Sequence, residues 1–130
     1  MSDDPRKPTD AELALLAILW DRGPSTVRQV HSALDSSAGY TTVLKTFQIM
    51  NDKGFVARDT SQRSHVYTPT WSQSQVQGRL VNDLVDKAFG GNTGRLVLRA
   101  LEASPADPSE IAEIRALLDA LEEKPGEEGQ

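Results

Sequence analysis

Apolar residues recur at steps of three and four along most of this chain, which predicts a mainly α-helical protein. The helical stretches are separated by helix-ending glycine and proline residues at Gly23-Pro24, Gly54, Gly90-Gly91 and Ser104-Pro105. The pattern changes between residues 55 and 68, where two short runs with the composition of strands flank polar turn residues. The sequence therefore predicts three helices, a β-hairpin and then further helices.

The third predicted helix, from about Thr41 to Lys53, has two chemically different faces. Val43, Phe47 and Met50 follow one another at steps of four and three, so one face can pack on a core. The other face consists of short or cationic hydrogen-bonding residues, which are Thr41, Thr42, Lys45 and Thr46. A helix that is anchored on one side and presents small polar groups on the other is suited to the major groove of DNA. An ordinary solvated helix face is the alternative interpretation.

Capping residues mark where the other helices begin. Thr9 and Glu12 form a capping box ahead of the first apolar run, and Ser25 or Thr26 caps the short second helix. The stretch Asp107-Pro108-Ser109-Glu110 is a strong start for the last helix, because it places Asp at the N-cap and Pro at the first helical position.

Three helices and a β-hairpin within roughly sixty residues match the plan of a winged helix-turn-helix domain. We assign residues 9–70 to that domain and residues 71–122 to a C-terminal helical domain. Residues 1–8 and the acidic residues 123–130 are expected to be disordered. The predicted fold class is mainly α, a winged helix-turn-helix with three helices and a β-hairpin wing, followed by a helical dimerisation domain.

The C-terminal helices carry more apolar surface than one chain can readily bury. In the last helix, apolar residues at steps of three, four and three form a narrow, heptad-like seam. Because the winged helix already has its own core, pairing with a second copy is favoured over packing within one chain. The predicted dimerisation residues are Val76, Leu80, Leu84, Leu96, Val97, Ile111, Ile114, Leu118 and Leu121.

Residues around the third helix are further candidates for contact with double-stranded DNA. The start of the second helix offers free N–H groups to a phosphate, and the hairpin tip offers basic side chains. The hydroxyl of Tyr40 can reach a phosphate, whereas half-burial of its ring in the core is the competing interpretation. The predicted DNA-binding residues are Ser25, Thr26, Arg28, Tyr40, Thr41, Thr42, Lys45, Thr46, Arg63 and His65.

The distribution of charge agrees with this interpretation although the chain carries a net charge of −5. Residues 22–69 contain six basic and three acidic residues, a balance of +3, whereas residues 71–130 contain six basic and eleven acidic residues, a balance of −5. Nucleic-acid binding depends on the local charge at the contact surface, so the global sign does not exclude it.

Composition narrows the class of protein further. The chain has no cysteine, and its two histidines, His31 and His65, have no acidic residue at metal-ligand spacing, so we expect no metal, no cofactor and no enzymatic activity. No segment approaches the run of about eighteen apolar residues that spans a bilayer. The N-terminus also lacks the hydrophobic core of a signal peptide, so we expect a cytoplasmic protein without a membrane partner.

The chain resembles the penicillinase-repressor family of BlaI/MecI type in a series of short motifs. These are Glu12-Leu13 through Leu19-Trp20, Gly23-Pro24, Thr26-Val27-Arg28-Gln29-Val30, Tyr40-Thr41-Thr42-Val43, Lys53-Gly54 and Tyr67-Thr68-Pro69. The resemblance covers about residues 9–122. It implies a homodimeric repressor that binds palindromic operators and controls genes for β-lactam resistance, cell-envelope stress or metal export.

The resemblance also implies a route to derepression by a protease or an effector. Antibiotic-responsive members are cleaved in the C-terminal domain between an asparagine and a phenylalanine, whereas this chain has Arg99-Ala100 at the aligned position. A copper-responsive branch uses a cysteine-rich motif that this chain lacks. Two other interpretations remain open at this point: a winged-helix module that binds a protein instead of DNA, and a regulator with a small-molecule pocket between its domains.

Overall fold

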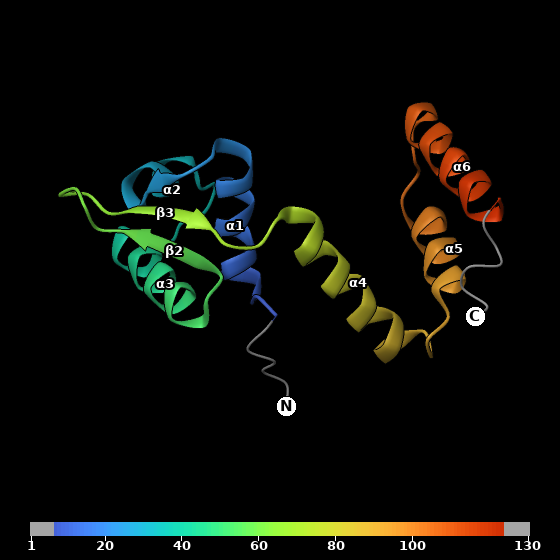
Figure 1. The fold of residues 1–130 in the computed structure, drawn as a ribbon, viewed down its shortest axis with the longest axis horizontal. Coiled ribbons are helices and arrows are strands. Elements are labelled where there is room, and N and C mark those ends of the chain that lie inside the picture. Colours follow the sequence, from blue (N-terminus) through green and yellow to red (C-terminus); the bar gives the residue numbers. More distant parts are fainter. Residues whose placement is uncertain (1–6, 124–130) are drawn as a thin grey trace. The chain divides into compact units, whose positions relative to one another are not determined.

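The computed structural model describes residues 7–123, which divide into two compact units between Asp83 and Leu84. Residues 1–6 and 124–130, which belong to the segments predicted to be disordered, lie outside the described residues. The elements are α1 (Asp10–Arg22), β1 (Ser25–Thr26), α2 (Val27–Ala33), α3 (Tyr40–Lys53), β2 (Val56–Asp59), β3 (Val66–Pro69), α4 (Gln73–Ala88), α5 (Thr93–Ala103) and α6 (Pro108–Glu122). The predicted order of three helices, a hairpin and then further helices is confirmed, and the further helices are α4, α5 and α6 (Figure 1).

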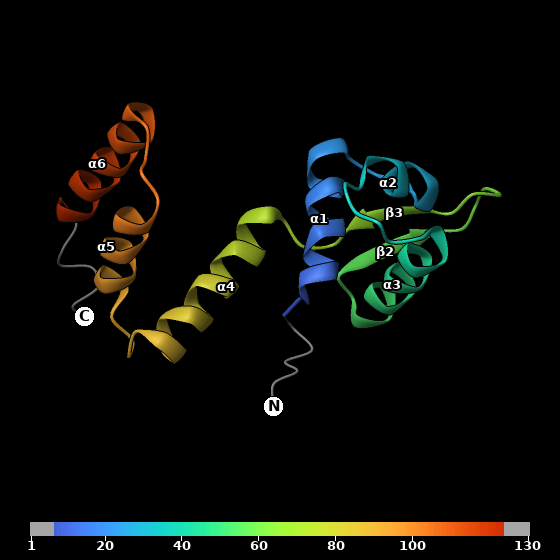
Figure 2. The ribbon, with the colours of Figure 1, turned by 180° about the vertical axis from the view of Figure 1, so that it is seen from behind.

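The first unit is a winged helix, in which α1, α2 and α3 pack with a small antiparallel sheet. Views from the two sides show the loop between β2 and β3 extending past α2 and α3 as a wing (Figures 1 and 2). The strand order is β1-β3-β2. The two-residue strand β1, which pairs Ser25 with Tyr67, was not predicted, because two residues are too short to show a strand period.

The core of this unit confirms the predicted inner face of α3. Val43, Phe47 and Met50 are almost fully buried, and the Phe47 ring stacks on Tyr67 of β3 with 4.6 Å between centroids. The remaining buried residues of the core are Leu15, Leu16, Leu19, Val27, Val30, Phe55 and Val56. Because α3 is held by its apolar face, its polar face is left on the surface.

The helix ends follow the predicted capping residues. Thr9 with Glu12 and Asp107 with Glu110 form reciprocal capping boxes, and Thr26, rather than Ser25, caps α2. Gly54 ends α3 in the left-handed conformation at φ 86°, which glycine adopts without a Cβ penalty. That turn sends the chain directly into Phe55 and the hairpin.

A buried ion pair links the first and third helices. The Glu12 side chain is 4% exposed; its Oε1 accepts the Thr9 N–H, and its Oε2 lies 2.8 Å from Lys53 Nζ. The pair was not predicted, because the two residues are 41 positions apart and neither local pattern requires the other.

The compact winged-helix unit extends past the predicted boundary at residue 70. Val76 in α4 is 1% exposed, and Asp83 forms an ion pair with Lys7 at 2.7 Å. Lys7 and the buried Pro8 are therefore placed against this unit, although residues 1–8 were expected to be disordered. Val76 is therefore buried within a single chain, whereas most of the other predicted dimerisation residues are exposed.

The second unit contains the end of α4 together with α5 and α6. Neither α5 nor α6 has a fully buried residue, and Val85 of α4 is the one buried apolar side chain among its described residues. Large apolar side chains are instead exposed by 37–59% on this unit: Leu84, Val97, Leu98, Leu101, Ile111, Leu117, Leu118 and Leu121. Leu96 and Ile114 are half-buried. Within residues 7–123, no helix combines the length and the apolar character needed to cross a membrane.

Candidate nucleic-acid interface

The polar face of α3 lies where the sequence predicted it. Thr41, Thr42 and Lys45 are exposed, on the side of the helix away from the buried Val43 and Phe47. The face therefore offers one ammonium group and two hydroxyl groups to solvent, within one turn of the helix. These are donors and acceptors of the kind that read base edges.

Thr46, the fourth predicted residue of this face, is half-buried and makes a hydrogen bond within the helix. Its Oγ1 donates to the backbone carbonyl of Thr42, one turn earlier, at 2.9 Å. This local bond satisfies the Thr42 carbonyl a second time and fixes the rotamer of the Thr46 side chain.

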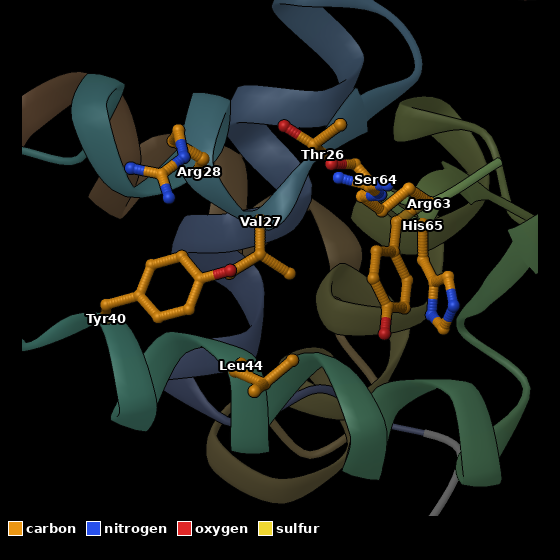
Figure 3. Close-up of a pocket in the computed structure, with 9 residues that line it drawn as sticks. Thr26, Val27, Arg28, Tyr40, Leu44, Arg63, Ser64 and His65 are labelled. Carbon is orange, nitrogen blue, oxygen red and sulfur yellow. The ribbon is translucent and has the colours of Figure 1, made fainter. Parts of the chain in front are cut away.

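A solvent-open cavity of about 220 Å³ lies beside this helix face, between the starts of α2 and α3 and the base of the wing. It is lined by Thr26, Val27, Arg28, Tyr40, Leu44, Arg63, Ser64, His65 and Tyr67. Figure 3 shows Arg28 and Tyr40 on one side of the hollow, and Arg63, Ser64 and His65 on the other. Five residues predicted separately from three elements are thus brought to one place.

Tyr40 stands at the first turn of α3, with its ring held by two residues of α2. The His31 ring meets it edge-on at 6.0 Å between centroids, and the Arg28 guanidinium carbon lies 5.8 Å from its centroid. His31 Nε2 donates in turn to the Ala38 carbonyl in the turn between α2 and α3, at 3.1 Å. Tyr40 itself is 42% exposed and lies outside the buried core.

Ser25 and Thr26 have different surroundings although they are neighbours. The Ser25 side chain is buried, and its Oγ donates to the Gly23 carbonyl at 2.8 Å, which leaves it no path to a phosphate. Thr26 is half-buried at the cavity edge, where its Oγ1 accepts the Gln29 N–H. The structure therefore removes Ser25 from the candidate DNA contacts and gives it a packing role.

The tip of the wing is shaped by a short side-chain turn. The Ser61 N–H donates to Asp59 Oδ1 at 2.9 Å, and hydrogen bonds from Ser61 lower the pKa of the Asp59 carboxyl from its ordinary value, with a smaller contribution from nearby His65. Arg63 and His65 follow on the exposed side of this turn. The Asp59 carboxylate is therefore engaged in a hydrogen bond with Ser61, while the side chains of Arg63 and His65 remain exposed to solvent.

Several residues of this site were not singled out from the sequence. Leu44 and Ser64 line the cavity, and His31 contacts the Tyr40 ring edge-on. No local pattern indicates these positions, because they depend on how the turn before α3 and the wing fold back on α2. Among the described residues, no group of three or more His, Asp or Glu side chains has the geometry to hold a metal ion.

The fold and this site define a class: a winged-helix protein whose third helix exposes a polar face beside a basic wing. The profile of the penicillinase repressor family matches residues 8–120, most of the chain, and the chain therefore belongs to that family of DNA-binding transcriptional repressors. No curated protein matches the chain. Among solved structures, it is similar to the DNA-binding domain of the repressor BlaI, determined in solution. That similarity has 25% sequence identity and a TM-score of 0.48, and covers 57% of this chain and 92% of that domain.

Proposed function

We propose that this repressor binds, as a homodimer, an operator with two symmetric half-sites and blocks transcription by occupying it. The observation that carries the proposal is the exposed Thr41, Thr42 and Lys45 face beside the cavity that gathers Arg28, Tyr40 and Arg63. Separate groups are thereby available for base edges and for the DNA backbone.

The candidate DNA-binding residues form two sets, one for base edges and one for the DNA backbone. On α3, Lys45 donates to guanine in the major groove, while the threonines exchange hydrogen bonds with base edges or place a methyl group against thymine. In the cavity, a backbone phosphate accepts from Arg28, Arg63 and the Tyr40 hydroxyl, with His65 and Thr26 at its margins. Phosphate contacts of this kind fix the register in which α3 meets the bases.

The apolar surface of the second unit supports the homodimer. Leu117, Leu118 and Leu121 on α6 are 53–59% exposed, and α5 adds the exposed Val97 and Leu101. An exposed apolar surface on two adjoining helices is typical of an association site. A second copy of the same surface would bury it and would bring two copies of α3 to half-sites about one helical turn, or a multiple, apart.

Loss of the dimer would release the DNA, since each half-site alone is a weak ligand. We propose that a protease or an effector acts at this level, and that the regulated genes serve β-lactam resistance or the response to cell-envelope stress. Arg99, at the aligned cleavage position, is exposed in the middle of α5 and pairs with Glu102 at 2.9 Å. A helical site of this kind must unwind before a protease can cut it.

Binding to the DNA upstream of its own gene tests the proposed function directly. We expect a discrete complex whose affinity falls steeply with salt, with a slope of about −3.6 or steeper on logarithmic axes, because two arginines in each of two protomers would displace counterions. A gel shift at several salt concentrations measures the slope. The alternative function, a winged helix that docks on a protein, predicts no DNA complex at any salt concentration.

Replacing Lys45 by alanine is expected to lower affinity about tenfold for the operator and much less for random DNA, because a lost base contact costs discrimination. Fluorescence anisotropy on both duplexes measures the two losses. Arg22→Ala, which removes one exposed positive charge from α1, is the matched control and should affect both duplexes equally. Equal losses for Lys45→Ala would make Lys45 a phosphate contact.

A further inference from the structure

The indole ring of Trp71 forms a joint between the winged helix and α4. The ring edge-stacks on the buried Phe55 with 5.9 Å between centroids, and the guanidinium of Arg79, two turns into α4, lies 4.3 Å above its centroid. The backbone of Trp71 is held as well, because Trp20 Nε1 donates to its carbonyl at 3.0 Å. Trp71 is thus fixed to α1, to the start of the hairpin and to α4.

Two further contacts hold the first turns of α4 against the same unit. Val76, one turn into the helix, is 1% exposed, and Asp83 pairs with Lys7 ahead of α1. A helix held near its start, at its first turn and again two turns later has a defined direction. The direction of α4 is therefore set by the winged helix rather than by the chain connection alone.

The joint also connects to the recognition helix. Phe55, the ring on which Trp71 stacks, follows directly after Gly54, the residue that ends α3. The last turn of α3 is tied to α1 by the Lys53–Glu12 ion pair, and α1 supplies the Trp20 hydrogen bond. A short path of packed groups therefore relates the axis of α3 to the axis of α4.

The length of α4 turns small changes at this joint into large displacements. The part of α4 that belongs to the first unit, residues 73–83, has 11 residues. At about 1.5 Å per residue this part is about 16 Å long, so a tilt of about 10° at its start moves its end by about 3 Å. That displacement is about one base-pair step of DNA, roughly 3.4 Å.

We propose that Trp71 and Arg79 are positioning residues that set which spacing between operator half-sites the dimer accepts. The inference rests on the proposed function, since it requires a homodimer that reads two half-sites. Neither residue is proposed to contact DNA. They act by holding α4 at one angle to α3, so that two winged helices meet the duplex at one separation.

The test uses the full chain and a duplex selected by the wild-type protein from a random pool. That duplex is rebuilt with the spacer shortened or lengthened one base pair at a time, and as a single half-site. The Arg79→Gln variant keeps the stem but removes the cation, Arg79→Lys restores a cation over the ring, and Arg22→Gln is the charge-matched control. Trp71→Ala removes the ring itself, and thermal unfolding checks that each variant is folded.

For the wild type we expect an affinity loss of about tenfold when the spacer changes by two base pairs. Arg79→Gln should reduce this discrimination at least threefold while its affinity for the single half-site stays within about twofold. Arg79→Lys should recover most of the wild-type profile, and Arg22→Gln should leave it unchanged. These are effects that a general loss of stability would not produce.

Three results would overturn the inference: an unchanged spacing profile in Arg79→Gln, a loss shared equally by all duplexes and the half-site, or the same change in Arg22→Gln. Failure of the proposed function would look different from these three results. The wild-type protein would then select no duplex, or would bind a duplex with two half-sites no more tightly than a duplex with one. If Trp71→Ala does not fold, the Arg79 variants alone decide.

Discussion

Replacing Leu118 by glutamate is expected to convert the protein from a dimer to a monomer and to weaken operator binding about a hundredfold. Leu118 lies in the middle of α6 and is 53% exposed in the single chain. If the exposed surface of α5 and α6 is the proposed dimer interface, the substitution places a carboxylate among leucines and loses their burial. An unpaired charge and a lost leucine contact together exceed about 3 kcal/mol, or a factor of about a hundred.

Sedimentation velocity over a range of concentrations measures the dissociation constant, and anisotropy on the operator measures binding. Ala116→Glu is the matched control, because at about 100° per residue it lies on the side of α6 opposite the seam. It adds the same charge to the same helix and should leave the dimer intact. A dimeric Leu118→Glu protein, or equal dissociation of both variants, would rule out the proposed interface.

Replacing Lys53 by methionine is expected to destabilise the winged helix by about 3 kcal/mol, because it leaves the carboxylate of Glu12 buried without its countercharge. The Glu12 side chain is 4% exposed and still accepts the Thr9 N–H, so its negative charge is only partly compensated. Urea unfolding, followed by tryptophan fluorescence, measures the free energy of unfolding. Trp20 and Trp71 both lie in this unit and report on it.

Two comparisons separate charge burial from simple loss of a side chain. Glu12→Gln retains an oxygen for the Thr9 N–H and leaves the partly exposed Lys53 ammonium in reach of water. It should therefore lower the free energy of unfolding by less than Lys53→Met does. In the double variant, the penalty of Lys53→Met should be largely absent, since no buried carboxylate remains. Lys45→Met, on the exposed face of the same helix, should change stability by less than about 0.5 kcal/mol.

Most of the fold was predictable because its signals are local. Steps of three and four placed the inner face of α3, capping boxes at Thr9 and Asp107 placed two helix starts, and Gly54 placed the end of α3. The pairing of Ser25 with Tyr67 was missed, since only the folded wing brings β1 beside β3. The Trp71 joint was missed for the same reason, because its partners come from three separate segments.

In the candidate site too, the features with local sequence signals were predictable and those that depend on the tertiary fold were not. The polar face of α3 followed from one helical period, and it is exposed as predicted. Ser25 was misplaced because a serine that caps a helix and a serine that faces into a strand pairing look alike in sequence. The convergence of Arg28, Tyr40 and Arg63 on one cavity depends on the tertiary fold, although each residue had been singled out by itself.

The hydrogen bond inside α3 has a chemical consequence for what the protein can recognise. Since the Thr46 hydroxyl gives its hydrogen to the Thr42 carbonyl, that side chain has only oxygen lone pairs and a methyl group left to offer a partner. Such a group can accept from the amino groups of adenine or cytosine, yet it has nothing to offer the O6 and N7 of guanine. Its neighbour Lys45 has the reverse character, with hydrogens and no lone pair. In the proposed complex with DNA, the two adjacent positions would therefore favour opposite kinds of base edge.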